Sequence, residues 1–224
     1  MNGKVINVAI DGPAGAGKST VSRAAAKEIG YIYVDTGALY RAVGVNALRI
    51  GADTKNAEQV AASLSGISVD LAFENGEQRV LLNGEDVSLE IRTPQASMAA
   101  SDVSAVPQVR DFLFDLQKNI AAANNCIMDG RDIGTVVLPD AQVKIFLTAS
   151  PEERAARRYK ELVEKGGSVN YKDVLEDLIK RDYNDSHRAV APLKPAEDSV
   201  ILDTTGFTLE KSVNEIIRII KEKI

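Results

Sequence analysis

The sequence has almost none of the residues from which disulfides and zinc sites are made. Cys126 is the only cysteine and His187 the only histidine among 224 residues. One cysteine cannot form an intrachain disulfide, and the two residues together are too few for a Cys/His zinc cluster. We therefore expect a protein of a reducing compartment that does not use a histidine base, and we expect His187 to lie on the surface.

A basic excess and a long apolar run are also missing. The formal net charge is −5 at pH 7, whereas a nucleic-acid-binding scaffold normally carries a strong basic excess. No apolar run approaches the ~20 residues that cross a bilayer, and the first residues lead directly into an apolar strand rather than a signal peptide. We therefore expect a cytoplasmic protein with neither a nucleic acid nor a membrane as its partner.

Short apolar runs alternate with helical patterns along the chain. The runs that predict strands are 5–10, 31–35, 126–132, 143–147 and 199–203. Amphipathic patterns between them predict helices, including 36–50, 107–122 and a closing helix at 208–223. This alternation is typical of an α/β fold whose parallel sheet has helices on both faces.

Residues 66–90 interrupt this alternation. Ile67, Val69, Leu71 and Phe73 alternate with polar or small residues, and two Asn-Gly pairs follow at 75–76 and 83–84. Alternation with Asn-Gly turns predicts a small antiparallel hairpin. Since nothing in this stretch carries chemistry, we interpret it as an insertion that shapes or covers a substrate domain.

The residues that follow the first strand form a phosphate-binding loop. The stretch 12–20 reads GPAGAGKST and fits G-x-x-x-x-G-K-[ST], with a strand before it and a helical pattern after it up to Gly30. In such a loop, backbone amides cradle phosphate oxygens, the lysine adds a mobile cation and the serine offers a hydroxyl to Mg²⁺. The predicted ATP-binding residues are Gly12, Pro13, Ala14, Gly15, Ala16, Gly17, Lys18, Ser19 and Thr20.

Charged residues follow two other predicted strands. Thr36 is an expected N-cap for the helix that carries Arg41, and Arg41 could reach a second phosphate. Asp129 is a candidate carboxylate on the metal side, and Arg131 with Asp132 would project toward the nucleotide. Arg41 on a solvated surface helix is the alternative interpretation.

Two late helices each gather arginines. Arg154, Arg157 and Arg158 stand at i, i+3 and i+4, which puts three guanidinium groups on one face. Arg181, Asp185 and Arg188 also share a face. Such a face favours visiting anions, although a solvated helix with Glu152, Glu153 and Glu161 as partners is the alternative.

An acidic protein that collects arginines near a P-loop is suited to phosphoryl transfer. Guanidinium groups hold phosphate oxygens in a fork, and phosphoryl transfer needs mainly positioning and charge neutralisation. A phosphate acceptor needs no base, because its second pKa is about 6. We therefore favour a phosphorylated acceptor. A kinase of a small alcohol such as shikimate and a nucleotide-dependent switch remain the alternatives.

Four further motifs resemble bacterial cytidylate kinases, in order and over essentially the whole chain. They are DTGALYR at 35–41, IRT at 91–93, DGRDIGTVV at 129–137 and RDYNDSHRAVAPL at 181–193. The resemblance implies an adenylate-kinase-like P-loop NTPase fold: a five-stranded parallel sheet flanked by helices, with an inserted monophosphate-binding domain and a lid. It implies a core of 1–35, 91–150 and 171–224, a monophosphate-binding domain of 36–90 and a lid of 151–170.

The same resemblance implies the reaction ATP + CMP or dCMP → ADP + CDP or dCDP, with Mg²⁺ accompanying ATP, and a role for individual residues. Ser101, Arg110 and Asp132 would read the edge of cytosine. Arg181 and Asp185 would hold the sugar, and the acceptor phosphate would be held by Thr36, Arg41, Arg131 and Arg188. Lys18, Arg131 and the lid arginines Arg157 and Arg158 would act in catalysis.

Two residues depart slightly from the pattern of the family. Thr36 stands where some relatives have serine and keeps the hydroxyl. Ser19, the expected metal-side residue, stands where some relatives have glycine. Because no long apolar surface stripe is evident, we expect a monomer.

Overall fold

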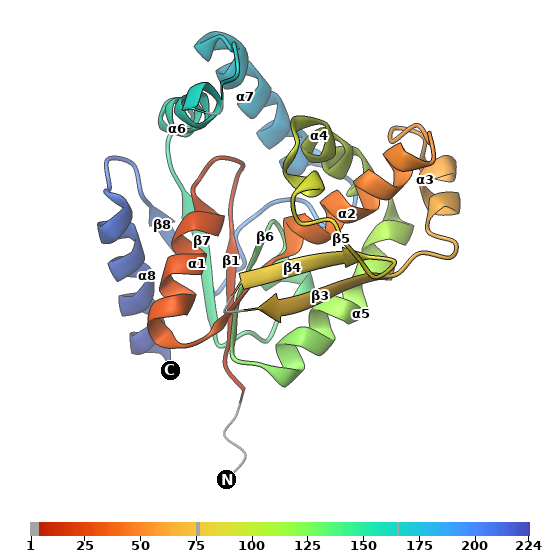
Figure 1. Cartoon of the computed structure of the whole chain (residues 1–224). Coiled ribbons are helices and arrows are strands. Elements are labelled where there is room, and N and C mark those ends of the chain that lie inside the picture. The colour runs from red at the N-terminus through yellow and green to blue at the C-terminus, as the bar shows by residue number, and fades with distance from the viewer. Residues whose placement is uncertain (1–4, 75–76, 165) are drawn as a thin grey trace. The chain divides into compact units, whose positions relative to one another are not determined.

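The computed structural model describes residues 5–74, 77–164 and 166–224 (Figure 1). Its contacts divide the chain into two units. The smaller unit consists of Met1–Val5 and Ile32–Asn125, and the larger unit consists of Ile6–Tyr31 and Cys126–Ile224.

The sheet has five strands in the order β2-β6-β1-β7-β8. Strand β1 pairs in parallel with both β6 and β7, and β7 pairs in parallel with β8. The bounds are β1 (Asn7–Asp11), β2 (Ile32–Asp35), β6 (Cys126–Gly130), β7 (Val143–Thr148) and β8 (Val200–Asp203). In β1, Val8, Ala9 and Ile10 are completely buried, as expected for a central strand covered on both faces. The expected parallel five-stranded sheet is confirmed.

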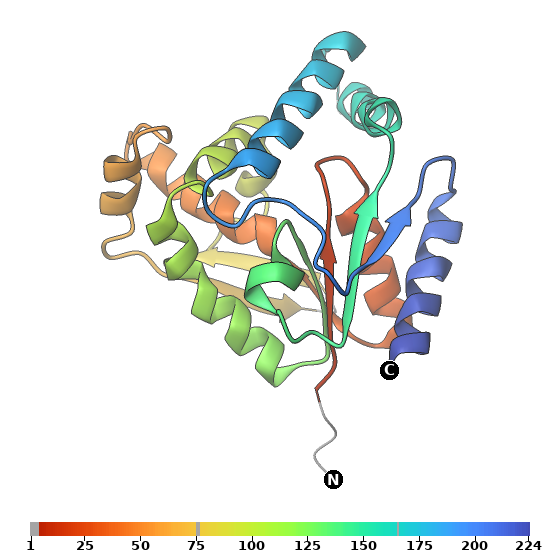
Figure 2. The same ribbon diagram turned by 180° about the vertical axis from the view of Figure 1, so that it is seen from behind.

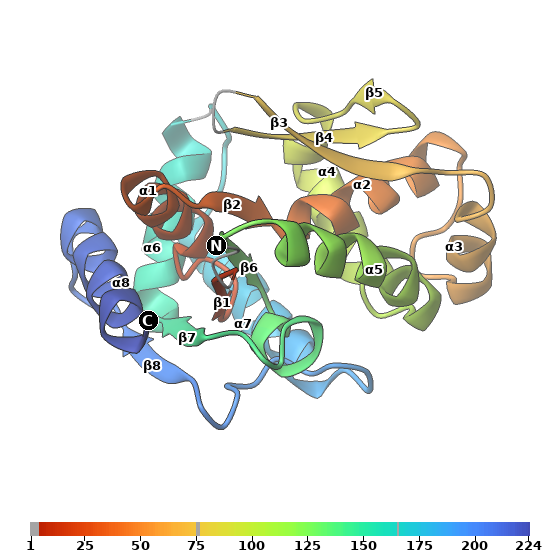
Figure 3. The same cartoon turned by 90° about the horizontal axis from the view of Figure 1, so that it is seen from below.

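Four helices of the larger unit accompany these strands: α1 (Lys18–Ile29), α6 (Pro151–Glu164), α7 (Tyr171–His187) and α8 (Leu209–Lys223). Helix α1 ends at Gly30, whose φ of 74° is left-handed, as the position of this glycine predicts. Thr208 caps α8 by accepting the N–H of Lys211, and α8 packs beside α1 (Figure 3). Helices α6 and α7 pack on each other (Figure 2).

The smaller unit holds the antiparallel insertion and most of the remaining helices. Besides β2, its elements are α2 (Thr36–Arg49), α3 (Ala57–Ser63), β3 (Val69–Glu74), β4 (Glu77–Leu82), β5 (Glu85–Asp86), a 3-10 turn (Glu90–Arg92), α4 (Pro94–Val103) and α5 (Pro107–Ala123). The three short strands form a sheet in the order β3-β4-β5, which confirms the expected antiparallel hairpin. The predicted turn at 75–76 lies outside the described residues, whereas Asn83 and Gly84 adopt the positive φ that their Asn-Gly turn requires.

Helix α2 is the centre of the smaller unit. It packs most extensively on α4 and also contacts β4 and α5. A Cβ at Gly44 would lie 2.9 Å from Ala99 Cβ, so the two helices approach at a position where only glycine fits. Leu39, Val43, Val103 and Leu113 are fully buried in the core cluster around this contact.

The start of α2 differs from the sequence-based expectation. The N-cap of α2 is Asp35, whose side chain accepts the N–H of Ala38, and Thr36 is the first helical residue. Both residue types cap helices well, and here the helix begins one residue earlier than expected. Arg110 is buried although it lies off the apolar stripe of α5. The smaller unit also extends through α4 and α5, beyond 36–90. The predicted core, monophosphate-binding domain and lid are defined by the ligands they bind and not by contacts, so they stay a prediction.

His187 is exposed, as expected, and stacks on Tyr183 with 4.0 Å between the ring centroids. Cys126 is buried as a free thiol. Within the described ranges, no helix combines the length and the apolar character needed to span a membrane.

Candidate active site

The loop between β1 and α1 has a backbone that glycine alone permits at three positions. Gly12 has φ 151°, and a Cβ there would lie 2.0 Å from the carbonyl oxygen of Leu147 in β7. Gly15 and Gly17 are left-handed, with φ of 72° and 87°, and Gly17 is the N-cap of α1. These conformations turn successive amides toward one side at the positive end of a helix dipole. The loop is therefore built to bind phosphate oxygens.

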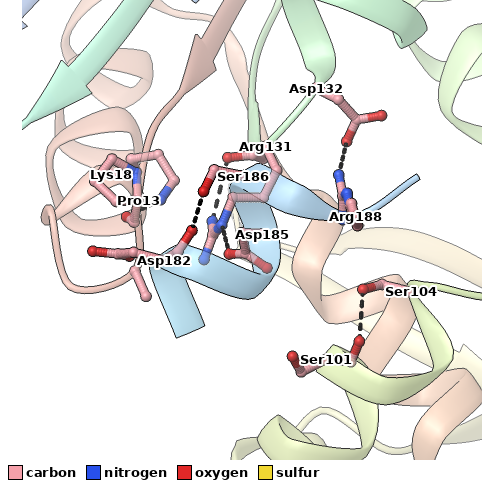
Figure 4. A network of polar contacts seen from close by, with 12 residues as sticks. Pro13, Lys18, Ser101, Ser104, Arg131, Asp132, Asp182, Asp185, Ser186 and Arg188 are labelled. Atoms are coloured by element: carbon pink, nitrogen blue, oxygen red, sulfur yellow. Dashed lines mark hydrogen bonds and ion pairs between the residues drawn. The ribbon is translucent and has the colours of Figure 1, made fainter. Parts of the chain in front are cut away.

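Lys18 is buried at the first residue of α1, and its ammonium group donates to the carbonyl oxygen of Pro13 at 2.8 Å (Figure 4). Burial, together with the positive charge of Arg131, lowers its pKa from 10.5 to about 7, although Asp129 and Asp11 act in the opposite direction. An anion beside the ammonium group favours the charged form. Lys18 is thus a desolvated cation that a bound phosphate would stabilise.

A hydroxyl and a carboxylate lie together next to this lysine. Ser19 Oγ donates to Asp129 Oδ2 at 2.9 Å, and Asp129 is buried near the carboxyl end of β6. Among the described residues, no group of three or more His, Cys, Asp or Glu side chains could hold a metal ion. Magnesium needs no such cage, because it keeps water and substrate phosphates as ligands, so this pair of oxygen donors fits Mg²⁺.

The arginines that follow β6 and α7 are held by carboxylates. Arg131 Nε donates to Asp185 Oδ2 at 2.8 Å, and Arg188 Nη2 donates to Asp132 Oδ1 at 3.2 Å (Figure 4). Although burial acts against both charged forms, Asp185 raises the pKa of Arg131 and Arg131 lowers the pKa of Asp185. The positive charge of Arg181 lowers the pKa of Asp185 too, so Arg181 belongs to the same cluster. The structure therefore brings together all five of these predicted residues.

The three arginines of α6 are not equivalent. Arg157 pairs with Glu153 and also donates to the carbonyl oxygen of Ala16 in the P-loop at 3.4 Å, and Arg158 pairs with Glu161 at 2.8 Å. About a third of each of these two side chains is exposed. Exposed pairs of this kind contribute only about 0–1 kcal/mol, so an incoming phosphate can displace the glutamate. Arg154 is buried instead, so the three arginines that were expected to share one face of the helix are not equally open to an incoming anion.

Sequence reasoning missed a carboxylate in this region. Asp11, the last residue of β1, accepts the N–H groups of Ile133 and Gly134 at 2.8 and 2.7 Å. These amides begin the π-helical turn Ile133–Val137 that follows Asp132. Burial raises the pKa of Asp11 to about 6 although both amides lower it. A charged residue at the end of an apolar strand was the available signal.

In the smaller unit, Arg41 and Thr36 lie at the start of α2. Arg41 Nη2 donates to Asp35 Oδ2 at 2.7 Å, so one aspartate both caps the helix and orients the arginine. Thr36 is buried directly at the N-terminus, where the helix dipole favours an anion. This end of α2 can therefore hold a phosphate.

Arg110 and Ser101 are connected within the same unit. The Arg110 guanidinium lies 5.8 Å from the centre of the Tyr40 ring, and its Nη1 is 3.5 Å from the carbonyl oxygen of Ser104. Ser104 Oγ in turn donates to the carbonyl oxygen of Ser101 at 2.9 Å (Figure 4). A buried arginine held over an aromatic ring is a specific donor for a flat polar ligand.

Comparison with known proteins gives the family of the chain. The family model for cytidylate kinase matches residues 8–222. The chain belongs to the cytidylate kinase family. Members of this family are phosphotransferases, so the protein is an enzyme.

Curated members of the family are about half identical to this chain over nearly their full length. The cytidylate kinase of Caldanaerobacter subterraneus is 51% identical over 97% of this chain and 95% of its own length. That of Caldicellulosiruptor saccharolyticus is 49% identical over 96% of both chains. Among solved structures, an uncharacterised protein from Eubacterium ventriosum aligns with a TM-score of 0.52 at 12% identity, covering 96% of this chain and 98% of its own. This second likeness concerns the fold alone.

Proposed function

We propose that this family member transfers the γ-phosphoryl group of ATP to CMP or dCMP and releases ADP with CDP or dCDP. The observation that carries the proposal is the cytidylate kinase match over residues 8–222, a range that includes every residue assigned below. The P-loop, the Lys18 ammonium and the cluster of partly buried arginines support the same reaction, because phosphoryl transfer depends on positioning and charge neutralisation.

The P-loop residues are assigned to ATP. Its amides and Lys18 would hold the β- and γ-phosphates, and Ser19 would contribute the oxygen that holds Mg²⁺, close to Asp129. Magnesium bound with ATP would neutralise phosphate charge. The metal and its donors are part of the proposal.

The acceptor phosphate is assigned to Thr36, Arg41, Arg131 and Arg188. In the reaction, an oxygen of this phosphate forms a bond to the γ-phosphorus while the bond from that phosphorus to the β-bridging oxygen breaks, and ADP carries the leaving charge away. The attacking phosphate is already anionic near neutrality, since its second pKa is about 6. The enzyme therefore needs no general base, which agrees with a chain that has one exposed histidine.

Arg157 and Arg158, with Lys18 and Arg131, are assigned to the transferring group. The guanidinium groups of Arg157 and Arg158 would exchange their glutamate partners for phosphate oxygens, and so would act only when nucleotides are bound. Water would be excluded by the same movement.

The base and the sugar are assigned to the remaining residues. Asp132 and Ser101 would accept from the cytosine amino group, Arg110 would donate to the ring acceptors, and Arg181 with Asp185 would hold the sugar. Uracil would place an oxygen where cytosine has its amino group, so a carboxylate there would be left unpaired or repelled. The arrangement therefore predicts a preference for CMP and dCMP over UMP.

A coupled assay of ADP release tests the proposal, with CMP, dCMP, UMP, AMP and no acceptor compared at equal concentration. We expect rapid turnover with CMP and dCMP, slow turnover with UMP and AMP, and almost no ATP hydrolysis without an acceptor. Equal rates with UMP and CMP would contradict the assigned base recognition. Turnover only with an unphosphorylated alcohol would instead favour a small-metabolite kinase.

A further inference from the structure

The guanidinium group of Arg154, the fourth residue of α6, contacts three separate segments of the larger unit. Nε donates to the carbonyl oxygen of Ala149 at 2.9 Å, Nη1 donates to that of Ala14 in the P-loop at 2.9 Å, and Nη2 lies 2.7 Å from Asp182 Oδ2 in α7. Only 4% of the side chain is exposed. Because each nitrogen has a protein acceptor, Arg154 is not placed as a phosphate ligand.

The P-loop is attached to the same two helices by apolar contacts. Ala14 packs in a buried cluster with Ala155 of α6 and with Val174 and Leu178 of α7. A Cβ at Gly15 would lie 3.3 Å from Arg154 Cβ, which is closer than ordinary contact. The outer turn of the P-loop is thus seated on α6 and α7 (Figure 2).

Helix α7 continues from this attachment to the residues assigned to the acceptor. Asp182 contacts Arg154, and Asp185, three residues later on the same helix, contacts Arg131 at 2.8 Å. Arg188, at the end of the helix, contacts Asp132. A continuous series of direct contacts therefore runs from Ala14 through Arg154 and α7 to Arg131 and Asp132.

We propose that Arg154 is a positioning residue that couples ATP in the P-loop to the acceptor residues on α7, so that each substrate strengthens the binding of the other. The inference rests on the proposed function, because it takes Arg181, Asp185 and Arg188 as acceptor-binding residues. The ammonium group of Lys18 donates to Pro13 O, in the peptide next to the one that Arg154 holds. A triphosphate that binds the Lys18 ammonium group would shift the P-loop turn whose carbonyl oxygen Arg154 holds. Because the guanidinium group is planar and also contacts Asp182, such a shift would move Asp182 and α7 as well.

The test measures the Kd of CMP by calorimetry with and without a non-hydrolysable ATP analogue and Mg²⁺, in the full-length enzyme. For the wild type we expect the analogue to tighten CMP binding about tenfold, within the range usual for coupled sites, and CMP to tighten the analogue by the same factor. In Arg154→Lys and in Asp182→Asn, we expect the factor to fall below about twofold while the Kd of CMP alone changes little. The KM for CMP should rise more than kcat falls.

The two variants and a control separate coupling from general damage. Asp182→Asn keeps both carbonyl contacts of Arg154, so it decides the question if Arg154→Lys does not fold. Lys172→Gln removes an exposed ion pair with Glu176 on α7 and should keep the wild-type factor. In a cycle of the two variants, the double variant should lose no more coupling than either single one.

Other outcomes separate this inference from the proposed function. The inference about Arg154 is overturned if the ATP analogue still tightens CMP binding by the wild-type factor in the folded variants. It is also overturned if the wild-type enzyme phosphorylates CMP but binds its two substrates independently. If the wild type does not phosphorylate CMP at all, it is the proposed function that fails.

Discussion

The proposed catalytic role of Lys18 and the stability of the fold make opposite demands on this buried lysine. The pKa of Lys18 is lowered to about 7 because burial and neighbouring arginines disfavour its charge. For Lys18→Met we expect kcat to fall by about 10²- to 10³-fold, the loss usual for one electrostatic donor, while the free energy of unfolding at pH 7 does not fall. Lys160→Met, at an exposed lysine of α6, should change neither quantity.

The pH dependence of stability provides the measurement. Between about pH 7 and 10.5 the unfolded chain binds the Lys18 proton and the folded enzyme does not, so stability rises with pH across this window. In urea unfolding at pH 6.5, 8 and 9.5, the free energy of unfolding of the wild type should therefore rise relative to that of Lys18→Met, by up to a few kcal/mol. A constant difference between the two proteins would show that Lys18 keeps its ordinary pKa.

Asp132 is the residue on which base choice depends in the proposal. It is buried, and Arg188 orients it by a contact of 3.2 Å. In Asp132→Asn one acceptor oxygen becomes a donor, so CMP should lose and UMP should gain a partner. We expect the ratio of kcat/KM for CMP over UMP to fall by about 10- to 100-fold, the value of a hydrogen bond to a charged group. An unchanged ratio from steady-state assays with both nucleotides would assign base recognition elsewhere.

At the scale of elements, the sequence predicts most strands and helices because their signals are local. An apolar run gives β1, a left-handed glycine ends α1, and Thr93 followed by Pro94 begins α4. The burial of Arg110 and Arg154 could not be predicted in this way. Arg110 contacts the Tyr40 ring in α2, and Arg154 contacts a P-loop carbonyl oxygen and a carboxylate of α7. All of these partners are distant in sequence. The spacing of apolar residues predicts which face of a helix is buried, but it does not predict which cation pairs with a carboxylate that is distant in sequence.

The contact between α2 and α4 offers a test at the same scale. In Gly44→Ala the new methyl group would meet Ala99 Cβ at 2.9 Å and Ala100 N at 3.2 Å, so the helices must separate. We expect a loss of about 1–3 kcal/mol in the free energy of unfolding, as for other overpacked cores, measured by urea denaturation. Gln95→Ala, on the exposed side of α4, should stay within about 0.5 kcal/mol. An unchanged free energy of unfolding in Gly44→Ala would mean that α2 and α4 can separate at this contact at little cost.

At the scale of the whole molecule, the net charge of −5 does not show that several arginines are gathered in one place. Arg131, Arg181 and Arg188 gather around Asp132 and Asp185, in the unit that contains the P-loop. Asp129 and Asp11 act in addition on Lys18, so these cations already have carboxylate neighbours within the protein. In the proposed reaction, phosphate oxygens would replace some of these carboxylates as partners of the arginines, so an acidic net charge does not oppose the proposal.

The two units also make the residue assignments testable without measuring activity. The residues assigned to ATP all belong to the larger unit, whereas those assigned to CMP include Thr36 and Arg41 in α2, Ser101 in α4 and Arg110 in α5 of the smaller unit. Ligand binding raises the free energy of local opening by RT ln(1 + [L]/Kd), about 2.7 kcal/mol at a hundredfold excess over Kd. Hydrogen exchange followed by mass spectrometry should therefore slow in peptides from α2, α4 and α5 when CMP is added. An ATP analogue alone should slow exchange in the P-loop and α1 and leave the smaller unit unchanged. If CMP protected the larger unit only, the assignments of Thr36, Arg41, Ser101 and Arg110 would be wrong, while those of Arg131, Asp132 and Asp185 would stand.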